Sequence, residues 1–146
     1  MKHCIVAALS VTLWLPVIAY GRSAGQAVSP ERSLSVTVDA EHPWVDSRLS
    51  VRKGERVSFE ADGTIRWGAE PGQVAGPEGH DGKAGKLGQG GLIGRVGYNG
   101  KPFAIGRMRA PIAMPKSGEL FLGINDFIFN DNAGSFSVTI YPNRTP

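Results

Sequence analysis

Residues 120–140, LFLGINDFIFNDNAGSFSVTI, are expected to form two β-strands joined by a polar loop. The first part, residues 120–124, is apolar or small and bounded by polar residues, which is typical of a buried strand. The last part, residues 135–140, alternates polar and apolar side chains, which indicates a strand with one buried face. The stretch predicts a strand–loop–strand unit, and the rest of the chain extends this pattern.

The loop between these strands is rich in side-chain oxygens. Five residues out of eight carry an amide or a carboxylate: Asn125, Asp126, Asn130, Asp131 and Asn132. Ca²⁺ prefers six to eight oxygen ligands of this kind. Asn, Asp and Gly are also the usual residues of ordinary turns, so composition leaves both a plain hairpin and a cation site open. The spacing is not that of an EF-hand, because the required glycine and closing glutamate are missing.

Strand patterns recur along the rest of the chain. Apolar alternation or short apolar runs occur at residues 34–38, 49–51, 57–61, 65–67, 92–96, 102–105 and 108–114. Asp62-Gly63 is a hairpin signal between two of these segments. No stretch sustains the 3.6-residue apolar period of a helix. The sequence therefore predicts an all-β, jelly-roll-like β-sandwich of about eight or nine antiparallel strands.

The N-terminal segment has the organisation of a secretory signal peptide. Residues 1–21 contain Lys2, an apolar run and the small-x-small sequence Ala19-Tyr20-Gly21. The run is too short for a membrane anchor and contains Pro16. We expect residues 22–32 to be a flexible leader, residues 33–142 to be one domain and residues 143–146 to be a tail. The predicted location is secreted or periplasmic, and without Cys4 the mature chain would have no disulfide.

Composition argues against two classes of function. The net charge is +3 and the basic residues are scattered, whereas a nucleic-acid groove needs them clustered with stacking aromatics. The mature chain would have two histidines, no cysteine and no G-x-S-x-G motif, so we expect no enzyme. The glycine-rich stretch 68–91 lacks a dinucleotide fingerprint. Within it, His80 and Asp81 form a sugar-contacting pair, an acid–base pair, or neither.

Several motifs resemble one known family. Gly123-Ile124-Asn125-Asp126 followed by residues 131–140, DNAGSFSVTI, is similar to the C-terminal signature of the PA-IL-like, galactose-binding bacterial lectins. Similar segments carry the resemblance over residues 34–141: residues 44–47, 51–57, 63–68, 76–79 and 91–97. The resemblance implies a galactose-binding-domain-like sandwich, a Ca²⁺ cofactor, a carbohydrate partner of galactose type, no membrane span and a homo-oligomer as one possible assembly.

The resemblance also implies a metal site. In the family, side chains matching Asp126, Asp131 and Asn132 hold Ca²⁺. A main-chain carbonyl comes from the position matching Trp67, and a second comes from within the loop, which places it near Ile128. The expected metal ligands are therefore these five residues.

The sugar completes the calcium coordination in this family. The residues expected to contact it here are Asp126, Asp131, Phe127 and His80. Galactose-binding members carry a His-Pro-x-Gln stretch that contacts the exocyclic hydroxyl, whereas this chain reads His80-Asp81-Gly82-Lys83. The alternative function is a structural or adhesive β-sandwich module of the cell envelope that binds no sugar.

Overall fold

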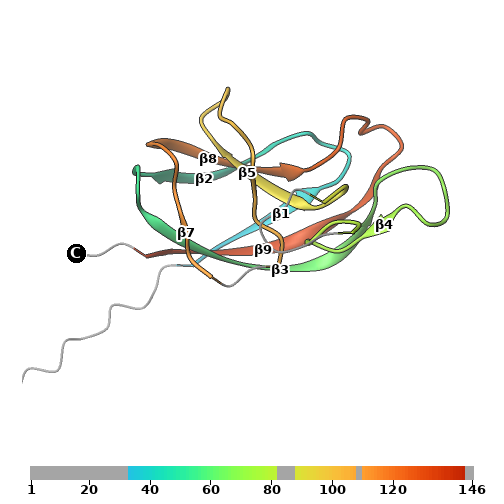
Figure 1. Ribbon diagram of the computed structural model, residues 1–146, viewed down its shortest axis with the longest axis horizontal. Coiled ribbons are helices and arrows are strands. Elements are labelled where there is room, and N and C mark those ends of the chain that lie inside the picture. Colours follow the sequence, from blue (N-terminus) through green and yellow to red (C-terminus); the bar gives the residue numbers. More distant parts are fainter. Residues whose placement is uncertain (1–32, 82–87, 108–109, 144–146) are drawn as a thin grey trace, which may run out of the picture.

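The computed structural model describes residues 33–81, 88–107 and 110–143. The predicted signal peptide, the leader as far as Arg32 and residues 144–146 lie outside this range. The described residues form nine strands and no helix, arranged as two layers (Figure 1). Among them, no helix has the length and apolar character needed to cross a membrane.

Both layers are antiparallel sheets. The larger sheet has the order β1-β9-β3-β4, and β7 also pairs with β3: β1 Leu34–Asp39, β9 Ala133–Asn143, β3 Arg56–Arg66, β4 Val74–Ala75 and β7 Ile112–Ala113. The smaller sheet has the order β2-β8-β5-β6: β2 Val45–Val51, β8 Gly118–Ile124, β5 Leu92–Val96 and β6 Phe103–Ala104. The predicted all-β sandwich of about eight or nine strands is confirmed.

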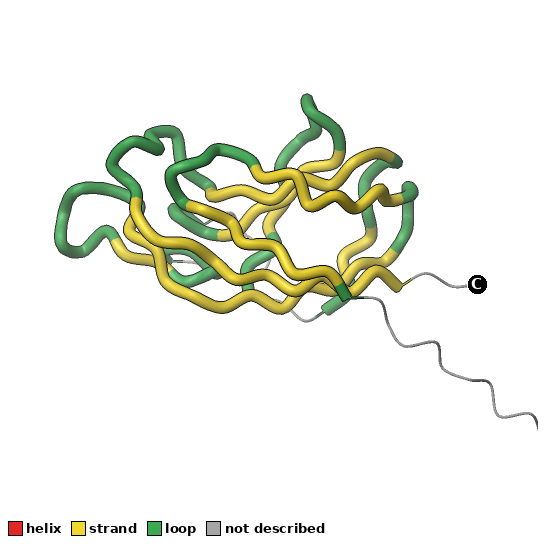
Figure 2. Tube along the Cα trace, turned by 180° about the vertical axis from the view of Figure 1, so that it is seen from behind, coloured by secondary structure: helices red, strands yellow, loops and turns green. Residues whose placement is uncertain are grey.

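The core lies between the two sheets. Alternate residues of β3 and β9 point into it, as do alternate residues of β8, because successive side chains of a strand face opposite sides. Phe59 and Phe136 from the larger sheet, and Leu120 and Leu122 from the smaller one, are among its fully buried side chains. Figure 2 shows the two layers of strands, with loops gathered at their ends.

The predicted turn at Asp62-Gly63 is wrong. β3 runs through both residues and pairs with β9 over its whole length, from Arg56 to Arg66. Gly63 lies opposite Phe136 with φ +116°, and a Cβ there would lie 2.6 Å from the carbonyl oxygen of Ser135. The glycine therefore allows a close backbone approach inside a continuous strand, and it does not end the strand.

The plain-hairpin alternative for residues 120–140 is also wrong. β8 belongs to the smaller sheet and β9 to the larger one, so the loop 125–132 crosses from one layer to the other. β4, which was not predicted, lies in the glycine-rich stretch and pairs with the end of β3. These connections bring the polar loop, the end of β3 and the glycine-rich stretch to the same end of the sandwich.

Candidate functional site

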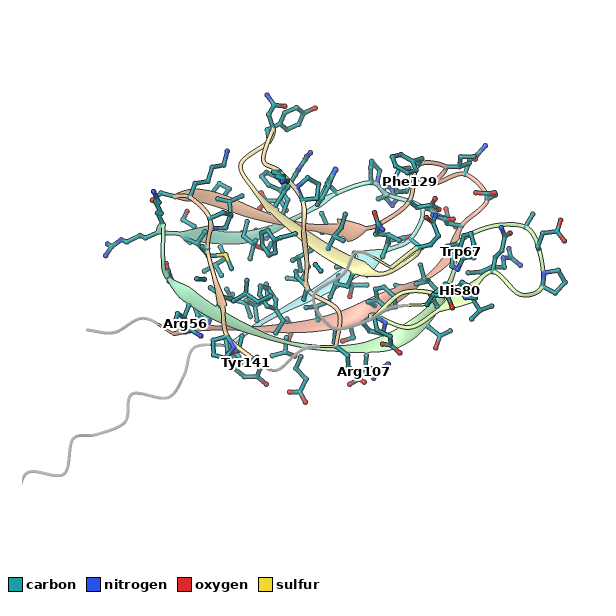
Figure 3. All side chains as sticks on the ribbon, in the orientation of Figure 1. Arg56, Trp67, His80, Arg107, Phe129 and Tyr141 are labelled. Carbon is teal, nitrogen blue, oxygen red and sulfur yellow. The ribbon has the colours of Figure 1, made fainter. Side chains whose placement is uncertain are left out.

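The expected metal ligands come from the ends of three strands. Asp126 follows β8, Asp131 and Asn132 precede β9, and Trp67 follows β3. The register pairs Arg66 with Ala133, which places Trp67 and Asn132 at the same end of two neighbouring strands. In Figure 3, the labelled Trp67, His80 and Phe129 lie at this end of the molecule.

Asn132 is fixed by Ala40, the residue that follows β1. Its side chain is 5% exposed, and its Nδ2 donates to the carbonyl oxygen of Ala40 at 3.0 Å. This bond leaves Oδ1 as the free end of the amide. Within the described residues, that buried oxygen has no hydrogen-bond donor.

Asp126 is held by one of its two oxygens. Oδ1 accepts from Nε2 of Gln89 at 2.8 Å and from the backbone N–H of Phe127 at 2.7 Å. Oδ2 is buried and has no donor in the part of the chain that the structure describes. The same is true of Oδ1 of Asp131. Each of the three predicted side-chain ligands thus presents one buried oxygen that is not hydrogen-bonded to the described chain.

Such a group of acceptors suits a cation. A buried polar atom without a partner costs about 1–3 kcal/mol, more if it is charged, and a bound cation would remove that cost. Two carboxylates and an amide are hard oxygen donors of the kind that Ca²⁺ takes. No cluster of three or more His, Cys, Asp or Glu side chains occurs in residues 33–81, 88–107 and 110–143. The side chains expected to hold the metal include only two residues of these types, Asp126 and Asp131.

Two main-chain carbonyls complete the expected donor set. Among the described residues, no hydrogen bond ends on the carbonyl oxygen of Trp67 or on that of Ile128. The carbonyl of Phe129, by contrast, accepts from the backbone N–H of Asn132 at 3.3 Å. The two carbonyls that the sequence analysis assigned to the metal are therefore free to serve as ligands.

Trp67 and His80 form an aromatic pair beside these ligands. Their ring centroids are 5.8 Å apart and the ring planes are tilted by 52°. Gly90 packs on the indole, where a Cβ would lie 2.6 Å from Cδ1 of Trp67. Nε1 of Trp67 is buried and donates to none of the described residues. The pair is therefore built by the glycine-rich stretch closing over the end of β3.

Gln89 is a site residue that the sequence analysis missed. Its carbonyl accepts from the backbone N–H of His80 at 2.7 Å, while its side chain reaches Asp126. The segment 88–91 is held against Asn125 by three hydrogen bonds of 2.8–2.9 Å. The only sequence signal was the glycines on both sides of Gln89, which permit this close approach.

Phe127 and Ile128 have exposed side chains. Phe127 is 91% exposed and Ile128 is 60% exposed, although both are large and apolar. Phe127 is tied to Asp126 through its backbone N–H, and its side chain extends into solvent. The ring therefore does not pack into the core and is accessible to a ligand.

Comparison with known proteins shows a likeness to a solved lectin structure. No protein-family model matches the chain, and no curated protein matches it. A solved structure described as the N-terminal domain of EclA, a PllA-like lectin, matches with a TM-score of 0.64 and 28% identity. The match covers 75% of this chain and 96% of that one. The chain is thus similar in fold to a PllA-like lectin domain, and this similarity supports a relationship to the PA-IL-like bacterial lectins.

Proposed function

We propose that this protein is a calcium-dependent lectin. The observation that carries the proposal is the set of three buried oxygens of Asp126, Asp131 and Asn132 that have no donor among the described residues. The similar solved structure is called a lectin, which supports a carbohydrate-binding role and not catalysis. The predicted signal peptide would take the protein to the periplasm or the outside of the cell.

The chain offers five donors for one ion. Oδ2 of Asp126, Oδ1 of Asp131, Oδ1 of Asn132 and the carbonyls of Trp67 and Ile128 are without hydrogen bonds to described residues. Ca²⁺ takes six to eight oxygens, so an ion held by these five donors would have one to three open positions. A seven- or eight-coordinate ion would therefore accept two neighbouring sugar hydroxyls. The two carboxylates provide the negative charge that balances the cation.

The same residues would orient the sugar. Asp126 and Asp131 can accept hydrogen bonds from the bound hydroxyls, and charge-assisted bonds of this kind are the stronger ones. Phe127 follows Asp126 along the chain, and His80 is linked to Asp126 through Gln89. Both His80 and Phe127 have exposed side chains. Galactose-type glycans are the ligands that we propose, and assembly into oligomers would raise the weak affinity of a single site.

Binding to immobilised glycans, with and without a chelator, tests this function. Galactose-terminated glycans should bind in calcium, and the signal should disappear in the chelator and in Asp126→Ala. Glu119→Ala removes the same charge at the other end of β8, and it should bind normally. A wild-type protein that binds no glycan in calcium would instead favour the structural or adhesive module.

A further inference from the structure

A second group of aromatic residues surrounds Arg95 on the outer face of the smaller sheet. The guanidinium carbon lies 4.1 Å from the ring centroid of Trp44, 5.3 Å from that of Tyr98 and 5.4 Å from that of Phe121. Arg95 is opposite Phe121 in the β5–β8 register. Their strand neighbours are buried in the core, so these two side chains point away from it.

This aromatic group is anchored to the sheet. A Cβ on Gly123 would lie 2.9 Å from Cε3 of Trp44, so the indole rests on the strand where a side chain is missing. Ile93 is opposite Gly123 and only 5% exposed, yet it is not part of the core cluster. Trp44 and Ile93 thus add apolar side chains to the outer face of the sheet near Arg95.

Arg95 has no acidic partner in the described part of the chain. No ion pair involves it, and its Nε is buried without an acceptor. Its terminal nitrogens donate to no described residue and are not among the buried unpartnered atoms, so they are open to solvent. Arg107, by comparison, binds Asp62 at 2.7 Å and Glu78 at 3.3 Å.

Asp46 is the acidic residue aligned with Arg95 and Phe121 across the smaller sheet, and it already accepts a hydrogen bond. Asp46 lies opposite Phe121 on the side away from Arg95, and its Oδ1 accepts from the backbone N–H of Arg48 at 2.8 Å. Burial lowers the pKa of Arg95, while Tyr98 raises it, and an arginine side chain remains charged in proteins. The guanidinium carbon lies over three rings and its terminal nitrogens are not buried, so an anion would approach through those nitrogens.

We propose that Arg95, Trp44, Tyr98 and Phe121 form a second, calcium-independent binding site for an acidic sugar. The open edge of the guanidinium can hold a carboxylate through two parallel hydrogen bonds. Tyr98 is 77% exposed beside it and offers a flat apolar surface to the sugar ring. A uronic acid carries both the carboxylate and the sugar ring in one monosaccharide. None of the four residues belongs to the proposed calcium site.

Titration with galacturonate in the presence of a chelator, followed by ligand-observed NMR, tests the proposal on the full chain. Wild-type protein should bind galacturonate, whereas galactose should not bind under these conditions. Arg95→Met should weaken galacturonate binding by at least about tenfold, because the charged hydrogen bonds are lost. Tyr98→Ser should weaken it several-fold, and Asp126→Ala should leave it unchanged.

The controls separate this site from the proposed lectin site and from a loss of folding. Tyr98 is so exposed that Tyr98→Ser should not disturb the core, and thermal unfolding checks both variants. Absence of galacturonate binding by the wild type, or equal binding by Arg95→Met, would overturn the proposal. Acetate binding as tightly as galacturonate would also overturn it, because the sugar ring would then contribute nothing. Galactose binding in calcium is measured separately and does not depend on these outcomes.

Discussion

At the scale of single residues, the proposed site depends on oxygens that the fold holds in place but does not pair. Asn132 is fixed through its nitrogen by Ala40, and Asp126 is fixed through one oxygen by Gln89. In both residues the other oxygen is buried and has no donor among the described residues. The packing thus orients each ligand before any ion arrives, which lowers the entropy lost on binding.

Asp131→Asn should keep the fold and weaken calcium binding. The amide retains an oxygen at the same place, but one negative charge leaves the donor set, so we expect a loss of about tenfold in affinity. Calcium titration of the variant checks this. Glu119→Gln, which removes one negative charge from β8, is the control for the change in charge. An unchanged calcium affinity in Asp131→Asn would mean that this side chain is not a ligand.

Gln89→Ala should weaken calcium binding without changing its stoichiometry. The substitution removes the 2.8 Å hydrogen bond that holds Oδ1 of Asp126, so the carboxylate becomes less well oriented. We expect a several-fold loss of calcium affinity and little change of melting temperature in chelator. Gln73→Ala is the matched control, because the Gln73 side chain accepts from the backbone N–H of Glu70, whereas its bond to Trp67 is made by the backbone carbonyl, which the substitution keeps. Equal losses of calcium affinity in the two variants would mean that Gln89 does not position the metal site.

The residue types of the site were predictable, and their partners were not. Asp126, Asp131 and Asn132 were identified from the oxygen-rich loop and from the family resemblance. Gln89 could not be found in this way, because it reaches Asp126 from the far end of the glycine-rich stretch, 37 residues away along the chain. Contacts of that range depend on the path of a loop, which local composition does not determine.

At the scale of strands, alternation was a sound guide where one face is buried. Alternation predicted β1 and β9, whose apolar residues recur at every second position, while β8 was predicted from a short apolar run. It failed at Asp62-Gly63, where turn-forming residues lie inside β3. The tight pairing of Gly63 with β9 prevails over the local preference for a turn, and only the register reveals that pairing.

Gly63→Val should destabilise the protein strongly. A Cβ at this position would lie 2.6 Å from the carbonyl oxygen of Ser135, and φ of +116° is strained for a branched residue. We expect a loss of about 2–4 kcal/mol in the free energy of unfolding, measured by urea denaturation. Gly54→Ala is the control, since φ is also positive there but nothing lies within 4 Å, and it should cost only about 1 kcal/mol. A Gly63→Val protein as stable as this control would contradict the assigned pairing.

At the scale of the whole molecule, the sandwich brings distant segments to one end. The crossing of the chain from β8 to β9 places the polar loop between the layers, and the end of β3 contributes Trp67 beside it. The segment 88–91 then closes over this end through Asn125 and Asp126. The smaller sheet leaves the Arg95 group on its outer face, so the two proposed sites are formed by different surfaces of one domain.

The most direct test of the account is a calorimetric titration of calcium into metal-free protein. The account predicts one ion bound per chain and no binding by Asp126→Ala, while Glu119→Ala binds as the wild type does. Failure of the wild type to bind calcium, or undiminished binding by Asp126→Ala, would contradict it.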